Sequence, residues 1–108
     1  MNKLFSNLTC VKLSEVNFKQ KILNSIYFNN NNLTLKGITE NSDEIGLDFG
    51  FFALSGSNTH GALFTEDAIK KGANLIITDT KGLKIIKEKQ LKISTIVFSE
   101  PRKIIPEL

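Results

Sequence analysis

The most constraining feature of this chain is the segment at residues 37–73. It reads as a strand, a polar turn, an apolar strand, a glycine-bounded polar loop and a helix. The apolar run at residues 49–54 is short and nearly continuous, which is typical of a strand covered on both faces. A buried strand that feeds a helix through such a loop is how α/β proteins present hydrogen-bond donors to an anionic ligand. The segment therefore predicts an α/β fold with a binding loop after its central strand.

Further apolar runs extend this unit. Residues 33–39 alternate apolar and polar, as a half-buried strand does, and residues 75–78 and 95–98 predict two more strands. A second helix is expected to begin after Gly82, because Leu83 and Ile86 follow it. Alternating strands and helices imply right-handed crossovers, and hence a small α/β sandwich with a mostly parallel four- to five-stranded sheet flanked by helices. The first helix is indicated by residues at helical spacing and a terminal glycine: Leu63, Phe64, Asp67, Ala68, Lys71 and Gly72.

Length and composition bound the organisation of the chain. With 108 residues and 41% hydrophobic content, one globular domain over residues 1–108 is expected. Residues 1–8 predict a short helix. In residues 13–28 the apolar positions fit neither the helical nor the strand period. Residues 101–108 start like a helix and stop without a terminating motif, as a chain cut at a domain boundary would. We therefore expect a single domain of a longer protein.

Several classes of protein are disfavoured. The apolar runs are too short to span a bilayer and no signal peptide is apparent, so a cytoplasmic protein without a membrane partner is expected. Cys10 is the single cysteine and His60 the single histidine, which excludes an internal disulfide and a His-based zinc site. The net charge of +3 invites a nucleic-acid partner, but the lysines of the second helix are mixed with Glu88, which favours a solvated face.

The loop at residues 56–61 has the glycine spacing of a phosphate-binding P-loop. Ala62 and Leu63 stand where that motif needs lysine and then serine or threonine, so ATP hydrolysis is not expected here. The backbone amides of the loop, with Ser57, Asn58 and Thr59, still suit a nucleotide. The alternative is that two glycines and small polar residues merely make a tight turn.

Other polar residues near the loop have two interpretations. His60 has no second ligand or orienting carboxylate apparent in the sequence, so an exposed loop histidine is expected rather than a metal ligand or acid–base group. The polar triplet at residues 41–43 either faces the loop or caps the turn before the next strand. The phenylalanines at positions 49, 51 and 52 are expected in the core.

From about residue 35 to the end, the chain carries a series of short motifs in a fixed order: Gly37-Ile38-Thr39-Glu40-Asn41-Ser42, Phe51-Phe52-Ala53-Leu54-Ser55-Gly56, Gly61, Ala68-Ile69-Lys70-Lys71-Gly72-Ala73 and Pro101-Arg102. In this order and spacing the chain resembles the N-terminal domain of the Mur ligases. That family shows Gly-Ile-Thr-x-Asp-Ser-Arg, a Phe-Val-Ala strand, a loop ending in Asp-Gly, a helix closing on Gly-Ala, and a later Pro-Arg. The start of the chain is more similar to the third amino-acid-adding ligase (MurE) than to the fourth (MurF).

The resemblance implies a site for the UDP moiety of UDP-N-acetylmuramoyl-L-alanyl-D-glutamate. By similarity, Glu40 and Ser42 would contact the uracil, and Ser57, Asn58 and Thr59 would line the same pocket. The chain departs from the family at Asp43, where an arginine is usual, at residues 47–50, which replace a Pro-Gly-Asp-Leu turn, and at His60, where an acid is usual.

The resemblance also implies how such a domain is used. In a complete ligase a central domain binds ATP and magnesium, a third domain presents the amino acid, and the N-terminal domain holds the remote UDP end so that the reacting carboxylate is positioned. This chain alone is then expected to carry no catalytic residue, metal or cofactor. The alternatives are the equivalent domain of MurF and a stand-alone α/β binding or interaction module.

Overall fold

The structure, a computed structural model, describes residues 11–12, 23–26, 33–56 and 59–101. The helix expected at residues 1–8, all but the first residue of the one expected at residues 101–108, and most of the ambiguous stretch at residues 13–28 lie outside these ranges. In chain order the described elements are β1 (Val11–Lys12), β2 (Asn24–Ile26), β3 (Thr34–Leu35), β4 (Gly37–Thr39), the 3-10 turn η2 (Ser42–Glu44), β5 (Phe49–Ala53), the 3-10 turn η3 (Gly61–Phe64), α1 (Thr65–Lys71), β6 (Leu75–Thr78), α2 (Thr80–Glu88) and β7 (Ser94–Val97).

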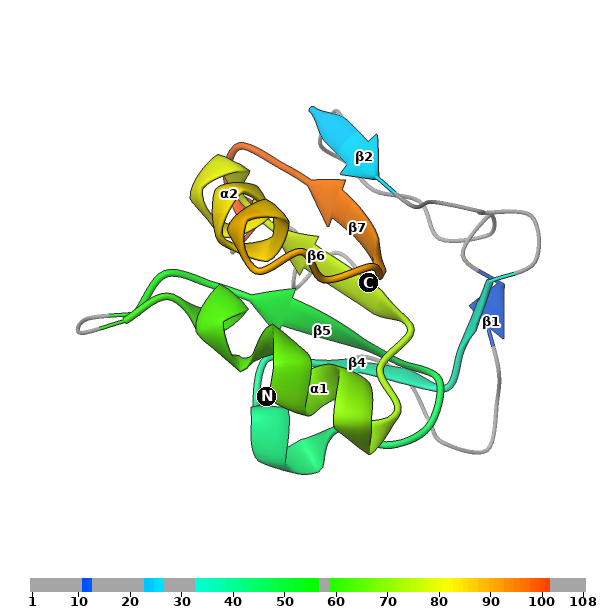
Figure 1. The fold of residues 1–108 in the computed structure, drawn as a ribbon. Helices are drawn as coiled ribbons and strands as arrows, with labels where there is room; N and C mark the ends of the chain where they lie inside the picture. Colours follow the sequence, from blue (N-terminus) through cyan, green and yellow to red (C-terminus); the bar gives the residue numbers. More distant parts are fainter. Residues whose placement is uncertain (1–10, 13–22, 27–32, 57–58, 102–108) are drawn as a thin grey trace.

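The main sheet has five strands in the order β2-β7-β6-β5-β4. Strands β4 to β7 are parallel to one another, and β2 pairs antiparallel with β7. The expected α/β class and mostly parallel sheet are therefore confirmed. Because β5, β6 and β7 follow one another in a single direction across the sheet, right-handed crossovers place α1 and α2 on the same face, as Figure 1 shows.

Strand β5 separates two hydrophobic clusters. All five of its residues are buried, which confirms the expectation of a strand covered on both faces. Phe51 packs in the cluster on the helix side, with Ala62, Ala68 and Ile86. Phe52 points to the opposite face of the sheet and packs in the second cluster, which includes Ile77. The expected core positions of the phenylalanines are thus confirmed.

The strand expected at residues 33–39 is divided into two. A bend at Lys36, whose amide donates to the carbonyl oxygen of Asp48 at 2.9 Å, separates β3 from β4. Strand β3 pairs antiparallel with β1 in a separate two-stranded sheet, whereas β4 is an edge strand of the main sheet. The alternating pattern could not reveal this break, because both halves keep extended backbone.

The face of the first helix that packs on the sheet is not the face that its large apolar residues predict. Ala62, Thr65 and Ala68 are buried, so the adjacent Leu63 and Phe64 are each 44% exposed. Small side chains on the inner face let η3 and α1 lie close to β5. Gly72 has φ +115° and ends α1, which confirms its expected role.

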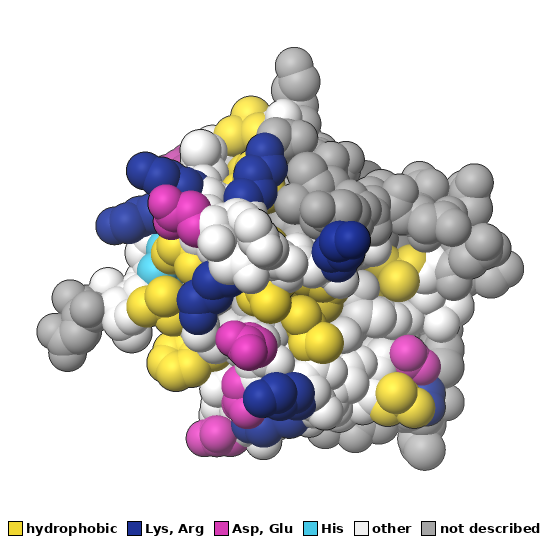
Figure 2. All heavy atoms as spheres, in the orientation of Figure 1, with side chains coloured by type: hydrophobic (Ala, Val, Ile, Leu, Met, Phe, Trp, Pro, Cys, Tyr) yellow, Lys and Arg dark blue, Asp and Glu magenta, His cyan; other side chains and the backbone are white. Residues whose placement is uncertain are grey.

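The second helix begins at Thr80, earlier than expected. Asp79 is its N-cap, and its side chain accepts a hydrogen bond from the Gly82 amide, so Gly82 lies inside the first turn. The lysines at positions 81, 84, 87, 89 and 92 are all exposed, which confirms the solvated face. Figure 2 shows such basic side chains spread over this face of the molecule among acidic ones. None of the described helices is long and apolar enough to cross a membrane.

Candidate functional site

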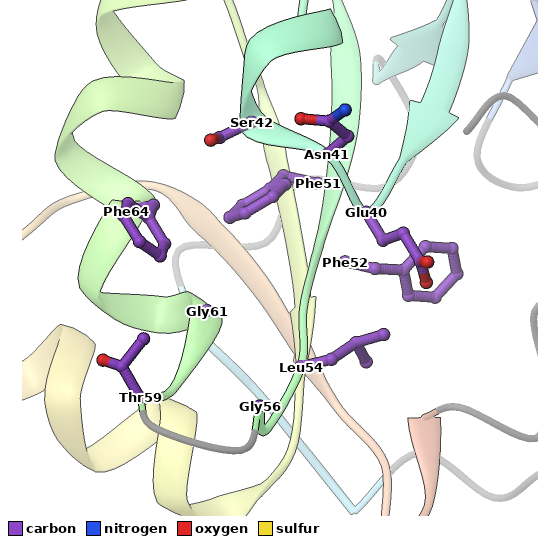
Figure 3. Close-up of a pocket in the computed structure, with 10 residues that line it drawn as sticks. All are labelled: Glu40, Asn41, Ser42, Phe51, Phe52, Leu54, Gly56, Thr59, Gly61 and Phe64. Atoms are coloured by element: carbon purple, nitrogen blue, oxygen red, sulfur yellow. The ribbon is translucent and has the colours of Figure 1, made fainter. Parts of the chain in front are cut away.

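A pocket of about 300 Å³ opens beside the carboxyl ends of β4 and β5 (Figure 3). This edge of a parallel sheet is where α/β proteins place ligands, because the chain leaves each strand there in a loop. The turn after β4 forms one side of the pocket, and the loop after β5 with η3 forms the other. The lining residues are Glu40, Asn41, Ser42, Phe51, Phe52, Leu54, Gly56, Thr59, Gly61 and Phe64.

The turn after β4 is held by its own polar side chains. The Thr39 hydroxyl accepts from the Asn41 amide at 3.0 Å, and the Asn41 side-chain oxygen accepts from the Asp43 amide at 2.9 Å. Asn41 therefore caps η2 and also lines the pocket. Both interpretations of residues 41–43, capping the turn and facing the loop, apply to it. The turn presents Glu40 and Ser42 at the pocket without using their side chains as caps.

Three of the five residues assigned to the UDP site lie around this one pocket. Glu40 and Ser42 line it from the β4 side, and Thr59 lines it from the loop. Ser57 and Asn58 lie outside the described residues. Phe51 and Phe52 also line the pocket, but each is only 2% exposed and contributes little of its surface.

The ends of the loop after β5 are closed by backbone hydrogen bonds. The Gly56 amide donates to the Thr59 carbonyl oxygen at 2.8 Å, and the Gly61 amide donates to the Leu54 carbonyl oxygen at 2.7 Å. A Cβ at Gly61 would lie 2.8 Å from the Leu54 nitrogen, so only glycine fits this approach of the two backbones. The two ends of the loop are therefore held close together by backbone contacts.

His60 is buried, which corrects the expectation of an exposed loop histidine. Its side chain is 4% exposed, and Nε2 lies 2.8 Å from Asp79 Oδ1. Nδ1 accepts the Ala62 amide hydrogen at 2.9 Å, so the imidazole hydrogen is on Nε2 and is donated to Asp79. The sequence concealed this partner because His60 and Asp79 are 19 positions apart and meet only when β5 and β6 pair.

Asp79 joins three parts of the structure. Besides accepting from His60, it accepts from the Gly82 amide at 2.8 Å and from the Ser55 hydroxyl at 3.2 Å. Serine, histidine and aspartate together suggest a hydrolase triad, but in a triad one imidazole nitrogen faces the serine. Here one nitrogen faces the carboxylate and the other a backbone amide, so the cluster fastens the loop to the start of α2.

Acid is expected to weaken the protein through Asp79. Burial alone would raise the pKa of this carboxyl, but the hydrogen bonds from the Gly82 amide and His60 outweigh it and lower the pKa below the usual 3.8. A lowered folded-state pKa contributes stability that is present above the unfolded value and is lost as the pH falls through the folded one. The wild type should therefore have a larger free energy of unfolding than Asp79→Asn at neutral pH, and this difference should shrink below about pH 4. Urea unfolding at pH 7 and pH 3 measures this, and a difference independent of pH would contradict it.

A lysine stands beside the pocket rim. Lys71 Nζ contacts Asp67 at 3.0 Å and Asp43 at 3.7 Å, and donates to the Ser42 carbonyl oxygen at 2.9 Å. The hydrogen bond to Asp67 raises the pKa of Lys71. Partial desolvation opposes this rise, and the charges of Asp67 and Asp43 add to it, so Lys71 is charged at neutral pH. The ammonium connects the end of α1 to η2 and holds the backbone of Ser42 in place.

Two residues of this region were missed as site residues by sequence reasoning. Phe64 was assigned only to helical spacing, although two adjacent bulky residues cannot both share an inner face with Ala62 and Thr65. Asp79 was not singled out, although an aspartate directly after a buried strand is a common N-cap. Within the described ranges, no three His, Cys, Asp or Glu side chains gather into a possible metal site.

The comparisons with known proteins agree with the motifs. No family model matches the chain. The UDP-N-acetylmuramoyl-L-alanyl-D-glutamate--2,6-diaminopimelate ligase of Rickettsia montanensis is 47% identical over 47 residues, which cover 44% of this chain and 10% of that protein. The ligases of the same name from Rickettsia prowazekii and Rickettsia typhi are 39% and 38% identical over 60 and 55 residues, or 56% and 51% of this chain. The chain spans only about a tenth of the length of these relatives. Over about half of its own length it is similar to the diaminopimelate-adding Mur ligases, which confirms the resemblance that its motifs indicated.

Proposed function

We propose that this chain is a substrate-binding domain of a MurE-type ligase and binds the UDP moiety of UDP-N-acetylmuramoyl-L-alanyl-D-glutamate. The observation that supports this most is the pocket at the carboxyl ends of β4 and β5. It brings together Glu40, Ser42 and Thr59, which are the residues that the resemblance to the Mur ligases assigns to the UDP site. The named relatives act on that substrate.

The chemistry of the pocket suits a uridine. The imide edge of uracil carries an N–H donor between two carbonyl acceptors. In this proposal the Glu40 carboxylate accepts the N–H, and the Ser42 hydroxyl donates to a carbonyl oxygen. Leu54, Phe51, Phe52 and Phe64 supply the apolar part of the lining. Thr59, with Ser57 and Asn58, lines the side along which the ribose and diphosphate extend.

In the proposed ligase the domain acts by positioning. Binding the remote UDP end fixes the glutamate carboxylate of the substrate in a separate central domain, where ATP and magnesium activate it for attack by diaminopimelate. This chain then supplies no catalytic residue and holds no metal or cofactor. Binding by the isolated chain is expected to be weak, because the other domains contribute the rest of the substrate site.

Truncating the polar wall should weaken UDP binding. Glu40→Ala and Ser42→Ala should each reduce the affinity for UDP about three- to tenfold, since one hydrogen bond to the ligand is lost in each. Amide-shift NMR titrations with UDP, and with UDP-N-acetylmuramoyl-L-alanyl-D-glutamate, give both the affinity and the site. In the wild type, shifts should centre on Ser42, Thr59 and the predicted residues Ser57 and Asn58.

Glu88→Ala is the matched control for Glu40→Ala. Glu88 is also exposed, but it ends α2, which leads back from the end of β6 to the start of β7 and so lies at the amino ends of the strands, away from the pocket. The control should bind as the wild type does. Shifts on another surface would refute the site, and no shifts at millimolar ligand would contradict binding of UDP by this chain.

A further inference from the structure

Phe64 is the one pocket-lining aromatic residue, among those the structure describes, that exposes a large part of its side chain. It is 44% exposed, whereas Phe51 and Phe52 are each 2% exposed. Exposing a phenyl ring costs solvation free energy that burial in the core would recover. An exposed ring at the rim of a pocket is therefore a candidate contact for a ligand.

The backbone fixes the ring on the outside. Ala62 and Thr65 on either side of Leu63 and Phe64 are fully buried, so the helical turn must direct Phe64 away from the sheet. The turn itself is pinned at both ends: the Ala62 amide donates to His60 Nδ1 at 2.9 Å, and the Thr65 amide donates to the Ala62 carbonyl oxygen. Phe64 is thus held at the pocket rather than free to fold into the core.

The opposite wall of the pocket is polar. In Figure 3 the Phe64 ring stands on the η3 side, with Phe51 beside it, and Asn41 and Ser42 stand across from it on the turn after β4. The Glu40 side chain extends to the other side of β5, toward Phe52. One wall therefore offers an aromatic face and the other offers hydrogen-bonding groups. A planar base with a π face and a polar edge uses both walls at once, whereas a phosphate uses only the polar one.

We propose that Phe64 stacks on the uracil ring of the bound nucleotide and is a specificity-determining residue of the site. This inference rests on the proposed function and deepens it, because it names the moiety that occupies the η3 side of the pocket. Stacking adds to the hydrogen bonds from the polar wall and explains why the ring is presented to solvent in the free protein. Ribose 5-phosphate, which lacks the base, should bind much more weakly than UDP.

The test is a titration of the 108-residue chain with UDP, followed by ligand and protein NMR. In the wild type, the uracil H5 and H6 resonances should move upfield under the ring current, and they should show NOEs to the Phe64 ring protons. Phe64→Leu keeps an apolar side chain but removes the π face, so UDP affinity should fall about tenfold and the upfield shift should vanish. Phe64→Tyr should restore both. The amide spectrum of each variant shows whether it is folded.

Leu63→Ala is the matched control. Leu63 is the neighbouring residue on η3 and is equally exposed at 44%, but it lines the adjacent pocket, with Ser55, Lys81 and Ile85, and not the one that holds Ser42 and Phe64. The two pockets meet at Gly56 and Thr59. Leu63→Ala should leave UDP binding and the uracil shifts unchanged.

The outcomes separate this inference from the proposed function. UDP binding by the wild type with unaltered affinity in Phe64→Leu, or with ring-current shifts on the ribose instead of the base, would overturn the stacking alone. Absence of UDP binding by the wild type would overturn both. The wild-type NOEs decide the question even if Phe64→Leu does not fold.

Discussion

Replacing Asp79 by alanine is expected to lower the free energy of unfolding by about 2–4 kcal/mol. The change removes the N-cap of α2, which costs about 0.5–2 kcal/mol. It also leaves the Nε2–H of His60 without its acceptor, and an unpaired buried donor costs about 1–3 kcal/mol. The imidazole cannot turn to another partner, because its Nδ1 is engaged by the Ala62 amide. Urea unfolding followed by far-UV circular dichroism measures the loss.

Asp79→Asn is the control for this change. The asparagine oxygen still accepts from Gly82 and His60, and its amide group can donate to the Ser55 hydroxyl. We expect a loss below about 1 kcal/mol at neutral pH, because the three contacts remain and only their charge assistance is lost. An Asp79→Ala variant as stable as Asp79→Asn would show that the cluster does not fasten the loop to α2.

Replacing Gly72 by alanine is expected to lower the free energy of unfolding by about 2–5 kcal/mol. Gly72 has φ +115°, a conformation that costs an alanine about 1–3 kcal/mol. Its Cβ would also lie 2.7 Å from Leu47 Cα and 3.0 Å from the Gly46 carbonyl oxygen, both of which are backbone atoms. The Asp48 amide donates to the Gly72 carbonyl oxygen at 2.9 Å, so relief of the contact would disturb the entry to β5. Thermal and urea unfolding measure the effect.

Gly46→Ala is the matched control for Gly72→Ala. Gly46 lies on the facing loop, has no positive φ, and its Cβ would meet only the Phe49 ring at 3.4 Å, an ordinary contact. The change should be within about 0.5 kcal/mol of neutral. Equal losses in the two variants would mean that the local loop, rather than the left-handed conformation and the backbone contact, sets the cost.

Both predictions concern the support of the pocket rather than its lining. Asp79 and His60 fasten the loop that carries Thr59, and Gly72 sets the approach of α1 to the turn before β5. Folded variants at these positions should therefore also bind UDP less well, since the pocket walls would no longer be held at a fixed separation. Lys71, which donates to the Ser42 carbonyl oxygen, acts in the same way on the β4 side.

Local patterns in the sequence determined most of the strand and helix assignments. The apolar run at residues 49–54 is the central buried strand β5, Gly72 ends α1, and the lysines of α2 face solvent. These features depend on side-chain hydrophobicity, on the freedom of glycine at positive φ and on helical periodicity, all of which act over a few neighbouring residues. The order of the motifs also sufficed to indicate the Mur ligase resemblance.

Only the tertiary structure decided the contacts between residues far apart in the sequence. His60 is buried because Asp79 meets it once β5 and β6 pair, and Phe64 faces the pocket because small residues beside it take the inner face. Strands β3 and β4 separated because each finds a different partner strand. Hydrogen-bond partners and burial depend on the packing of whole elements, whereas a sequence pattern reports the preference of one element alone.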